Sequence, residues 1–203
     1  VAILNADTVF CDPGSLQELL KPLTDEKAGI VGGHPIPTND KKTIAGFASH
    51  MIWTMHHYVS MVQPKIGEII AFRDIGARLP ANTNVDEDTL KMVIESSGCK
   101  SIYAPEAKVY NKGPENISDL VKQRTRVNIG QRHTKKKYDF DIPTWNTRIL
   151  LSAYVKAMRE LGFRPVKLIV FTGVELFSRL KAHLHVRSGK EDIPVWEPVG
   201  TTK

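Results

Sequence analysis

Segments with the apolar pattern of a β-strand alternate with segments of helical spacing over residues 1–130. Alternation of this kind is typical of a mostly parallel sheet covered by helices, so we predict an α/β fold of that type. Pro35 and Pro37 are expected to end the second strand, because proline cannot donate a ladder hydrogen bond. The expected strands cover residues 1–7, 28–33, 67–73, 101–104 and 106–110, and the expected helices cover residues 13–20, 44–62, 86–97 and 116–130.

The clearest helical pattern covers residues 44–62, where apolar side chains recur every three or four positions until Pro64. Three histidines lie on or near this apolar helix. We interpret them as packing or surface residues rather than ligands: His50, His56 and His57.

The composition becomes strongly basic after residue 130. We therefore place a boundary there, with residues 1–130 as one unit and residues 131–203 as a basic linker and a helical C-terminal extension. Within this extension, residues 166–180 are apolar but carry Lys167 and Glu175. They fall short of the roughly 20 apolar residues that a membrane span needs, so we expect an amphipathic or interfacial helix there.

The 203-residue chain has a formal charge of +6. This charge favours an anionic partner, such as a nucleic acid, a phosphorylated small molecule or an anionic membrane surface. Cys11 and Cys99 lack the paired spacing of a zinc site, so free thiols in a reducing, intracellular compartment are expected rather than a disulfide. The chain opens on an apolar strand without the features of a signal peptide, which suggests that something normally precedes it.

Asn5-Ala6-Asp7 stands at the carboxyl end of the first expected strand, where open α/β sheets bind their ligands. A carboxylate there can hold Mg²⁺ or Mn²⁺, which take oxygen ligands and leave positions for substrate phosphates. The same aspartate could instead simply cap the next turn.

Asp86-Glu87-Asp88 begins an expected helix, where the helix dipole favours ionised acids. Complementarity to the dipole would by itself explain three acids at this place. An ionised carboxylate at the ligand edge of a sheet can also accept the proton of an incoming hydroxyl. Asp88 is our choice for such a base, with Asp86 and Glu87 as competitors.

Gln123, Arg126 and Val127 fall on one face of the expected helix 116–130. Arginine binds phosphate oxygens through a planar fork, which suits a diphosphate leaving group that gains charge in the transition state. The alternative is a basic helix face that only meets solvent.

Five motifs follow one another in an order that resembles glycosyltransferase family two. The family shows Asp-x-Asp, Gly-Glu-hydrophobic-Phe-Arg, Glu-Asp, Tyr-x-Pro-Glu-Ala-x-Val and Gln-x-x-Arg-Trp, and the combination is more specific than any single motif. The Trp196-to-Lys203 ending is also similar to the tails of membrane-associated prokaryotic members. The matching stretches are Asn5-Ala6-Asp7, Gly67-Glu68-Ile69-Ile70-Ala71-Phe72-Arg73, Glu87-Asp88, Tyr103-Ala104-Pro105-Glu106-Ala107-Lys108-Val109 and Gln123-Arg124-Thr125-Arg126.

The resemblance implies a partial GT-A fold followed by a C-terminal helical extension. It implies an inverting transferase that moves a sugar from a nucleotide-diphosphate donor to an acceptor hydroxyl on a glycan, a polysaccharide or a lipid-linked molecule, assisted by Mg²⁺ or Mn²⁺. It also implies polysaccharide biosynthesis at the cytoplasmic face of the membrane, with a peripheral membrane contact and no nucleic acid.

Carried over to single residues, the resemblance implies that Asp7 with Asn5 binds the metal. Asp88 would deprotonate the acceptor, and Gln123 with Arg126 would hold the diphosphate or the acceptor. The further candidates for substrate binding are Arg124, Gly67 and Glu68.

Three positions depart from the family pattern. Asn5 stands where the first aspartate is usual and brings no charge. Val127 replaces the tryptophan, so stacking on a growing sugar chain is doubtful and single-sugar transfer is favoured. Asp88 is one residue nearer Gly98 than expected, which leaves the choice of base open.

The opening portion of the family, with its Pro-x-Tyr-Asn-Glu strand and the aspartates that read the nucleotide base, has no counterpart here. We therefore expect a fragment that lacks recognition of the base and is inactive alone.

Two rival functions remain. A nucleic-acid-binding module would use the basic stretch 122–137, but only Tyr138 and Phe140 supply aromatic rings beside it. A non-catalytic membrane-surface scaffold would lay residues 163–184 on the bilayer and set residues 135–137 against anionic headgroups.

Overall fold

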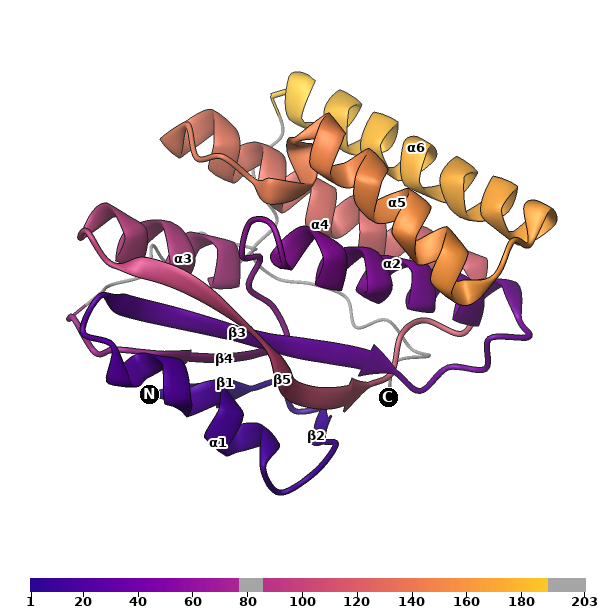
Figure 1. Cartoon of the computed structure of the whole chain (residues 1–203). Coiled ribbons are helices and arrows are strands. Elements are labelled where there is room, and N and C mark those ends of the chain that lie inside the picture. The colour runs from indigo at the N-terminus through magenta and orange to yellow at the C-terminus, as the bar shows by residue number, and fades with distance from the viewer. Residues whose placement is uncertain (77–85, 190–203) are drawn as a thin grey trace.

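The computed structural model describes residues 1–76 and 86–189. A curled five-stranded sheet lies between the short helix α1 on one side and the remaining helices on the other (Figure 1). Its strands have the order β1-β4-β3-β5-β2. The strands are β1 (Ala2–Leu4), β2 (Val9–Phe10), β3 (Ala28–Pro37), β4 (Ile69–Phe72) and β5 (Lys100–Asn111).

The sheet is mixed, so the prediction of a mostly parallel sheet was wrong in that respect. Strands β3 and β5 are parallel, whereas the pairs β1–β4, β2–β5 and β3–β4 are antiparallel. The alternating pattern does not determine strand direction. A helix that returns the chain to the starting end of the first strand gives a parallel pair, whereas a connection that stays at the far end of that strand gives an antiparallel pair.

Strand β3 continues through both of its prolines, contrary to the prediction that they end it. Pro35 lies opposite Val109 and Pro37 opposite Asn111 in β5. On its other side, β3 pairs with β4 only over residues 30–32 in the described part of the chain. On that side no described strand would accept a hydrogen bond from the backbone at Pro35 and Pro37. The missing N–H groups are therefore tolerated, as they are on an edge strand. The two expected extended pieces at 101–104 and 106–110 are likewise one strand, β5.

The predicted helices are all present where the chain is described. The helices that start after Thr43, Asn116 and Asn146 have side-chain caps; the Thr43 hydroxyl, for example, accepts a hydrogen bond from the Gly46 amide. The α-helices are α1 (Ser15–Leu20), α2 (Ile44–Ser60), α3 (Asp86–Ser96), α4 (Ile117–Tyr138), α5 (Thr147–Leu161) and α6 (Pro165–Arg187), with 3₁₀ turns at Lys21–Thr24 and Pro143–Trp145.

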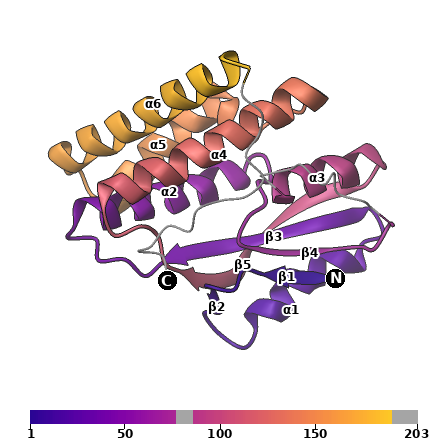
Figure 2. The same cartoon turned by 180° about the vertical axis from the view of Figure 1, so that it is seen from behind.

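Helix α4 passes through residue 130 without a break, so the change to a basic composition falls inside a helix. Helices α2, α4, α5 and α6 share one hydrophobic cluster, which contains Phe47, Leu120, Ala157 and Phe171. Helices α4 and α6 run side by side (Figures 1 and 2). The division of the chain at residue 130 stays a prediction.

Two further hydrophobic clusters join helices to the two faces of the sheet. Leu19 of α1 packs against Val31 and Val109 on one face, and Leu90 and Ile94 of α3 pack against the opposite face. In residues 1–76 and 86–189, no helix has the length and apolar character needed to cross a membrane.

Candidate active site

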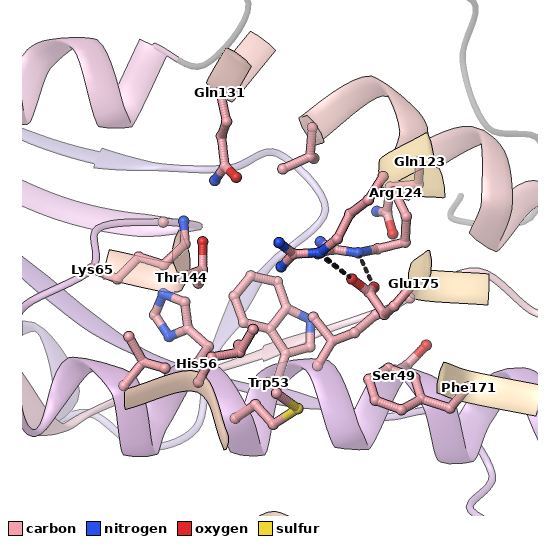
Figure 3. Close-up of a pocket in the computed structure, with 18 of the residues that line it drawn as sticks. Ser49, Trp53, His56, Lys65, Gln123, Arg124, Gln131, Thr144, Phe171 and Glu175 are labelled. Carbon is pink, nitrogen blue, oxygen red and sulfur yellow. Dashed lines mark hydrogen bonds and ion pairs between the residues drawn. The ribbon is translucent and has the colours of Figure 1, made fainter. Parts of the chain in front are cut away.

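A cavity of about 440 Å³ opens between the sheet and the helices α2, α4, α5 and α6 (Figure 3). Eight of the predicted site residues line it: Asn5, Gly67, Glu68, Glu87, Asp88, Gln123, Arg124 and Arg126. They come from the end of β1, the turn before β4, the start of α3 and the middle of α4. The tertiary structure thus brings together motifs that lie up to 121 residues apart in the sequence.

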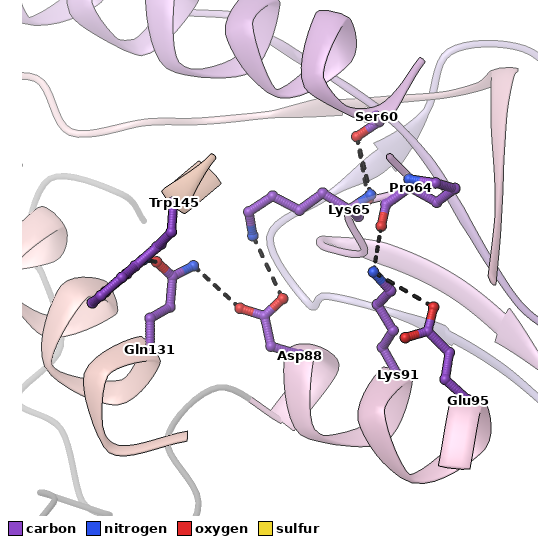
Figure 4. A network of polar contacts seen from close by, with 8 residues as sticks. All are labelled: Ser60, Pro64, Lys65, Asp88, Lys91, Glu95, Gln131 and Trp145. Carbon is purple, nitrogen blue, oxygen red and sulfur yellow. Dashed lines mark hydrogen bonds and ion pairs between the residues drawn. The ribbon is translucent and has the colours of Figure 1, made fainter. Parts of the chain in front are cut away.

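Asp88 is held in a buried polar network (Figure 4). Only 3% of the residue is exposed. Its Oδ1 lies 3.7 Å from the Lys65 Nζ, and its Oδ2 accepts a hydrogen bond of 3.2 Å from the Gln131 amide. Trp145 donates in turn to the Gln131 Oε1 at 3.4 Å. Among the described residues, no hydrogen-bond donor meets Oδ1, so this oxygen can accept a proton from a bound hydroxyl.

The loop that carries Lys65 is tied to α3. Lys91 donates from its Nζ to the Pro64 carbonyl at 2.7 Å and lies 3.6 Å from Glu95. Burial lowers the pKa of Lys91, yet these partners favour its charged form. Lys91 thus ties the residue next to Lys65 to α3, the helix that carries Asp88.

Glu68 is bound to the predicted metal-binding segment. Its carboxylate accepts a hydrogen bond of 2.8 Å from the Asn5 Nδ2, and its backbone carbonyl accepts one from the Asn5 amide at 3.0 Å. Burial raises the pKa of Glu68 to about 7, and the charges of Glu87 and Asp7 act in the same direction. Glu68 also has a φ of 51°, a conformation that is uncommon outside glycine and often found at functional sites.

The residues near Asp7 fit a cation that is shared with phosphates. Asp7 is exposed and does not line the cavity, but its charge reaches Glu68. Burial is the main cause of the raised pKa of Glu68, and the nearby acids Glu87 and Asp7 add to it. Asn5 directs its amide nitrogen at Glu68, so its side-chain oxygen is the atom that could face a cation. No group of three or more His, Cys, Asp or Glu side chains forms a metal cage within the described ranges, and an open Mg²⁺ or Mn²⁺ site needs only one or two carboxylates.

The candidate bases differ in environment. Asp88 is buried, whereas Glu87 is half-buried and also lines the cavity. Asp86 begins α3, but its side chain lies outside the described residues. Of the three candidate bases, Asp88 and Glu87 are therefore the two that line the cavity among the described residues.

The two arginines of α4 have different surroundings. Arg124 forms a two-point ion pair with Glu175 of α6, with Nε on Oε1 and with Nη2 3.2 Å from Oε2 (Figure 3). Its guanidinium is thus occupied in holding α4 to α6. Arg126 also lines the cavity, and its charge opposes the rise in the pKa of Glu68.

Sequence reasoning missed several lining residues. Gln131 lies one helical turn after Val127 on the predicted polar face of α4, so extending that face would have found it. Lys65 precedes β4 in a loop, and Trp53 and His56 lie on a helix whose pattern indicates packing. No signal in the sequence separates these three from ordinary loop and core positions.

The basic stretch is partly matched by acids and aromatic rings. Lys122 lies 3.5 Å from Asp119, and Lys135 lies 3.5 Å from Asp141. The Arg132 guanidinium stands 4.9 Å from the centre of the Trp145 ring. Several cations that a nucleic-acid-binding surface would use already have partners within this chain.

Comparison with known proteins agrees with the motifs. The family model described as "Glycosyl transferase family group 2" matches residues 1–186. The mannosyltransferase PcManGT from Pyrobaculum calidifontis, solved in complex with GDP-Man and Mn²⁺, has a similar structure with a TM-score of 0.56 and 16% sequence identity. The similarity covers 94% of this chain and 63% of that one, so this chain spans less than two thirds of the length of that protein. No curated protein matches significantly.

The fold similarity confirms the predicted α/β architecture of GT-A type. The family match extends past residue 130 and includes nearly all of α6. Because this match covers most of the 203 residues, the chain belongs to glycosyl transferase family group 2.

Proposed function

We propose that this chain carries the catalytic site of an inverting glycosyltransferase that moves a sugar from a nucleotide-diphosphate donor to an acceptor hydroxyl. The observation that carries the proposal is that Asp88 and Arg126 line one cavity together with the Asn5–Glu68 pair. A candidate base (Asp88), a guanidinium that can meet the leaving group (Arg126) and the side-chain oxygens of Asn5 and Glu68 therefore line the same cavity.

The reaction is a single displacement at the anomeric carbon. The acceptor oxygen forms a bond to this carbon while the bond to the donor phosphate breaks, and the electron pair leaves with the nucleoside diphosphate. Asp88 takes the acceptor proton on Oδ1, the oxygen that lacks a hydrogen-bond donor among the described residues. General-base catalysis of this kind contributes about 10²- to 10⁴-fold in rate. Attack from the face opposite to the leaving group inverts the anomeric configuration.

Arg126 and Gln123 would stabilise the charge that develops on the leaving diphosphate. A Mg²⁺ or Mn²⁺ ion held by Asp7 and Asn5 would supply further charge neutralisation at the diphosphate. The solved mannosyltransferase contains GDP-Man and Mn²⁺, which supports a nucleotide-sugar donor and a divalent cation for this chain as well.

Calorimetry with GDP and UDP as probes, each with and without MnCl₂, tests the donor side in the full-length protein. We expect binding of at least one nucleotide that needs Mn²⁺ and is weakened about tenfold or more by Asp7→Asn, since a carboxylate ligand is lost. Asp12→Asn, which changes an acid that caps the turn before α1, is the matched control. A nucleotide affinity that changes neither on removal of Mn²⁺ nor in Asp7→Asn would refute the metal assignment. NMR of the anomeric proton of the product tests inversion.

A peripheral membrane contact is the second part of the proposal. Exposed apolar side chains lie along α6, and Ile169, for example, is 72% exposed. The only acid within α6, Glu175, is bound to Arg124, so the other charged side chains of this helix are basic. An apolar stripe flanked by basic charge suits an anionic bilayer surface. The stripe consists of Val166, Ile169, Leu176, Phe177, Leu180 and Leu184.

Flotation with phosphatidylglycerol vesicles and with phosphatidylcholine vesicles tests this contact. We expect the protein to float with the anionic vesicles, and Ile169→Asp combined with Phe177→Asp to abolish flotation. Leu16→Asp combined with Leu20→Asp, at exposed positions of α1, is the control and should float as the unmodified protein does. Equal flotation of both double variants would argue against α6 as the contact. A contact of this kind would also support the predicted location at the cytoplasmic face of the membrane.

A further inference from the structure

His56 is a buried polar side chain without a hydrogen-bond partner in the described part of the chain. The residue is 6% exposed, and neither of its ring nitrogens meets a donor or acceptor within the described ranges. It nevertheless lines the cavity of the candidate active site (Figure 3). Buried polar groups in native proteins are almost always hydrogen-bonded, so the missing partner points to a ligand that enters the cavity.

The other histidines of α2 do not share this feature. The His50 Nε2 lies 2.9 Å from the Asn39 carbonyl oxygen, and the His57 Nδ1 lies 2.8 Å from the Tyr103 hydroxyl. Both bonds are made outside the cavity lining. The unsatisfied ring is therefore specific to the one histidine of this helix that faces the cavity.

Trp53 stands one helical turn before His56 and also lines the cavity. The two ring centres are 5.1 Å apart and the rings meet edge to face at 62°. Figure 3 shows the Trp53 indole reaching into the space between His56 and the Arg124–Glu175 pair. An aromatic surface and an unsatisfied imidazole thus lie next to each other on one helix.

Gly67 shows that there is room beside both rings. A methyl group added to Gly67 would lie 3.7 Å from the His56 Nε2 and 4.0 Å from the Cη2 and Cζ3 atoms of the Trp53 indole. These are the nearest atoms that the methyl would meet among the described residues. A ligand atom placed there would contact the indole and a ring nitrogen at the same time.

The chemistry of the two rings selects a polyhydroxylated, uncharged ligand. Burial lowers the pKa of His56 well below its ordinary range, and the charge of Lys65 acts in the same direction. The neutral imidazole has one N–H donor and one acceptor nitrogen, a combination that matches a hydroxyl group, which can both accept and donate. An indole surface offers a broad apolar contact for the C–H groups of a sugar ring.

The position of the two rings indicates the acceptor rather than the donor phosphate. Lys65, whose charge is felt by His56, is also the ion-pair partner of Asp88. Asp7, the candidate metal ligand, lies outside the cavity lining. A sugar on Trp53 and His56 is therefore on the side of the base that must take its proton.

We infer that Trp53 and His56 form an acceptor subsite that binds a hexopyranose ring, with the ring face on the indole and a hydroxyl on the imidazole. This inference rests on the proposed transferase function and makes the acceptor a sugar-bearing molecule. Both residues belong to α2, so the acceptor would be recognised by a helix that carries none of the transferase motifs.

Saturation-transfer NMR with methyl hexopyranosides, namely the α- and β-methyl glycosides of glucose, galactose and mannose, tests the subsite. We expect at least one glycoside to bind the unmodified protein. The dissociation constant should rise about tenfold in Trp53→Ala and roughly three- to tenfold in His56→Ala. Unchanged affinity in both variants, or no binding of any glycoside, would overturn the inference.

Gly67→Ala provides a second test in case Trp53→Ala or His56→Ala fails to fold. The added methyl has no contact shorter than 3.7 Å, so the fold tolerates it, but it occupies the space beside the two rings. We expect the glycoside affinity to fall about tenfold, as for a lost aromatic contact. Gly173→Ala on α6, where an added methyl meets nothing within 4 Å in the described part of the chain, is the control and should bind as the unmodified protein does.

Two further measurements separate this inference from the proposed function. A saturating nucleotide sugar with MnCl₂ should leave glycoside binding intact, whereas displacement of the glycoside would assign the rings to the donor sugar and overturn the acceptor subsite. If neither GDP nor UDP binds with Mn²⁺ while glycoside binding still depends on Trp53, the transferase proposal fails and the sugar site stands. If a nucleotide binds but Trp53, His56 and Gly67 have no effect on glycosides, the transferase proposal stands and the acceptor subsite fails.

Discussion

The ammonium group of Lys65 lies 3.7 Å from the Asp88 carboxylate, and 16% and 4% of these two side chains are exposed. A buried acid without a counterion would be costly, because desolvation disfavours its charge. Lys65 therefore supplies a counter-charge to the proposed base at a position where both side chains are largely buried. Gln131 fixes the other carboxylate oxygen at 3.2 Å, so the orientation of Asp88 is set as well as its charge.

Replacing Lys65 by Met should lower the free energy of unfolding on the order of 2 kcal/mol, because it leaves Asp88 buried without its cation. Urea unfolding followed by circular dichroism measures this loss. Lys112→Met removes an ion pair with Glu115 in which both side chains are more exposed and should cost less than about 1 kcal/mol. Equal losses in the two variants would show that burial of the Lys65 pair has no special weight.

Asp88→Asn should reduce the rate of sugar transfer about 10²- to 10⁴-fold, because the amide cannot accept the acceptor proton. Glu87→Gln should reduce it less than about tenfold, as expected for a lining residue that does not take the proton. Both changes preserve side-chain size, and turnover of the nucleotide sugar is the measurement. The reverse order of the two effects would make Glu87 the base.

The Arg124–Glu175 pair joins α4 to α6 through two contacts. Glu175→Gln should lower the free energy of unfolding by about 2 kcal/mol, since a charge-assisted, largely buried pair is lost. A double-mutant cycle with Arg124→Met should then give a clear coupling energy. The exposed Glu106–Lys108 pair serves as the control cycle, and a coupling no larger than its own would show that the α4–α6 contact depends on apolar packing alone.

Protonation of His34 should lower the stability as the pH decreases from about 6.5 toward 4, whereas the raised pKa of Glu68 acts in the opposite direction over the same range. Burial, together with the charge of His57, lowers the pKa of His34 to about 4, against the opposing effects of the Pro105 carbonyl and Glu160. The two rings are stacked with centres 4.4 Å apart. Because the folded-state pKa of His34 lies below that of the unfolded chain, the unfolded state binds more protons at His34 in this window, and the contribution of His34 to the free energy of unfolding rises with pH.

His34→Gln should reduce this pH dependence, as urea unfolding between pH 7.5 and 4.5 would show. Some dependence should remain, because burial also lowers the pKa of His56 and of His57. An unchanged slope in the variant would mean that His34 becomes protonated without cost in the folded protein.

The sequence indicated the local elements well because nearby residues decide them. Apolar spacing predicted a helix over residues 44–62, and α2 covers Ile44–Ser60. The three acids at residues 86–88 predicted a helix from there on, and α3 covers Asp86–Ser96. The family motifs also identified eight of the residues that line the cavity.

Strand direction and strand length depended on partners far away in the sequence. Pro35 and Pro37 continue β3 because the pairing with β5 extends beyond the point where β4 ends. A prediction that weighs each proline alone cannot include this, since the missing N–H is harmful only where a neighbouring strand would accept it.

In the candidate active site, too, contacts between distant segments could not be predicted from the local sequence. The doubt about sugar stacking considered only Val127, whereas the structure places the indole of Trp53, 74 positions earlier in the sequence, in the same cavity. Interpreting His56 as a packing or surface residue was reasonable for an apolar helix, but only the fold shows that its ring faces a cavity without a partner among the described residues.

Taken by itself, the sequence determined the helices, most strands and the motif residues Asp7, Asp88 and Arg126. The tertiary structure decided the sheet pairing, the ion pairs of Lys65 and Glu175, and the rings that share the cavity with the motifs. The physical reason is that backbone conformation responds to side chains a few positions away. Burial, pairing and cavity shape arise from packing between segments that the linear order keeps apart.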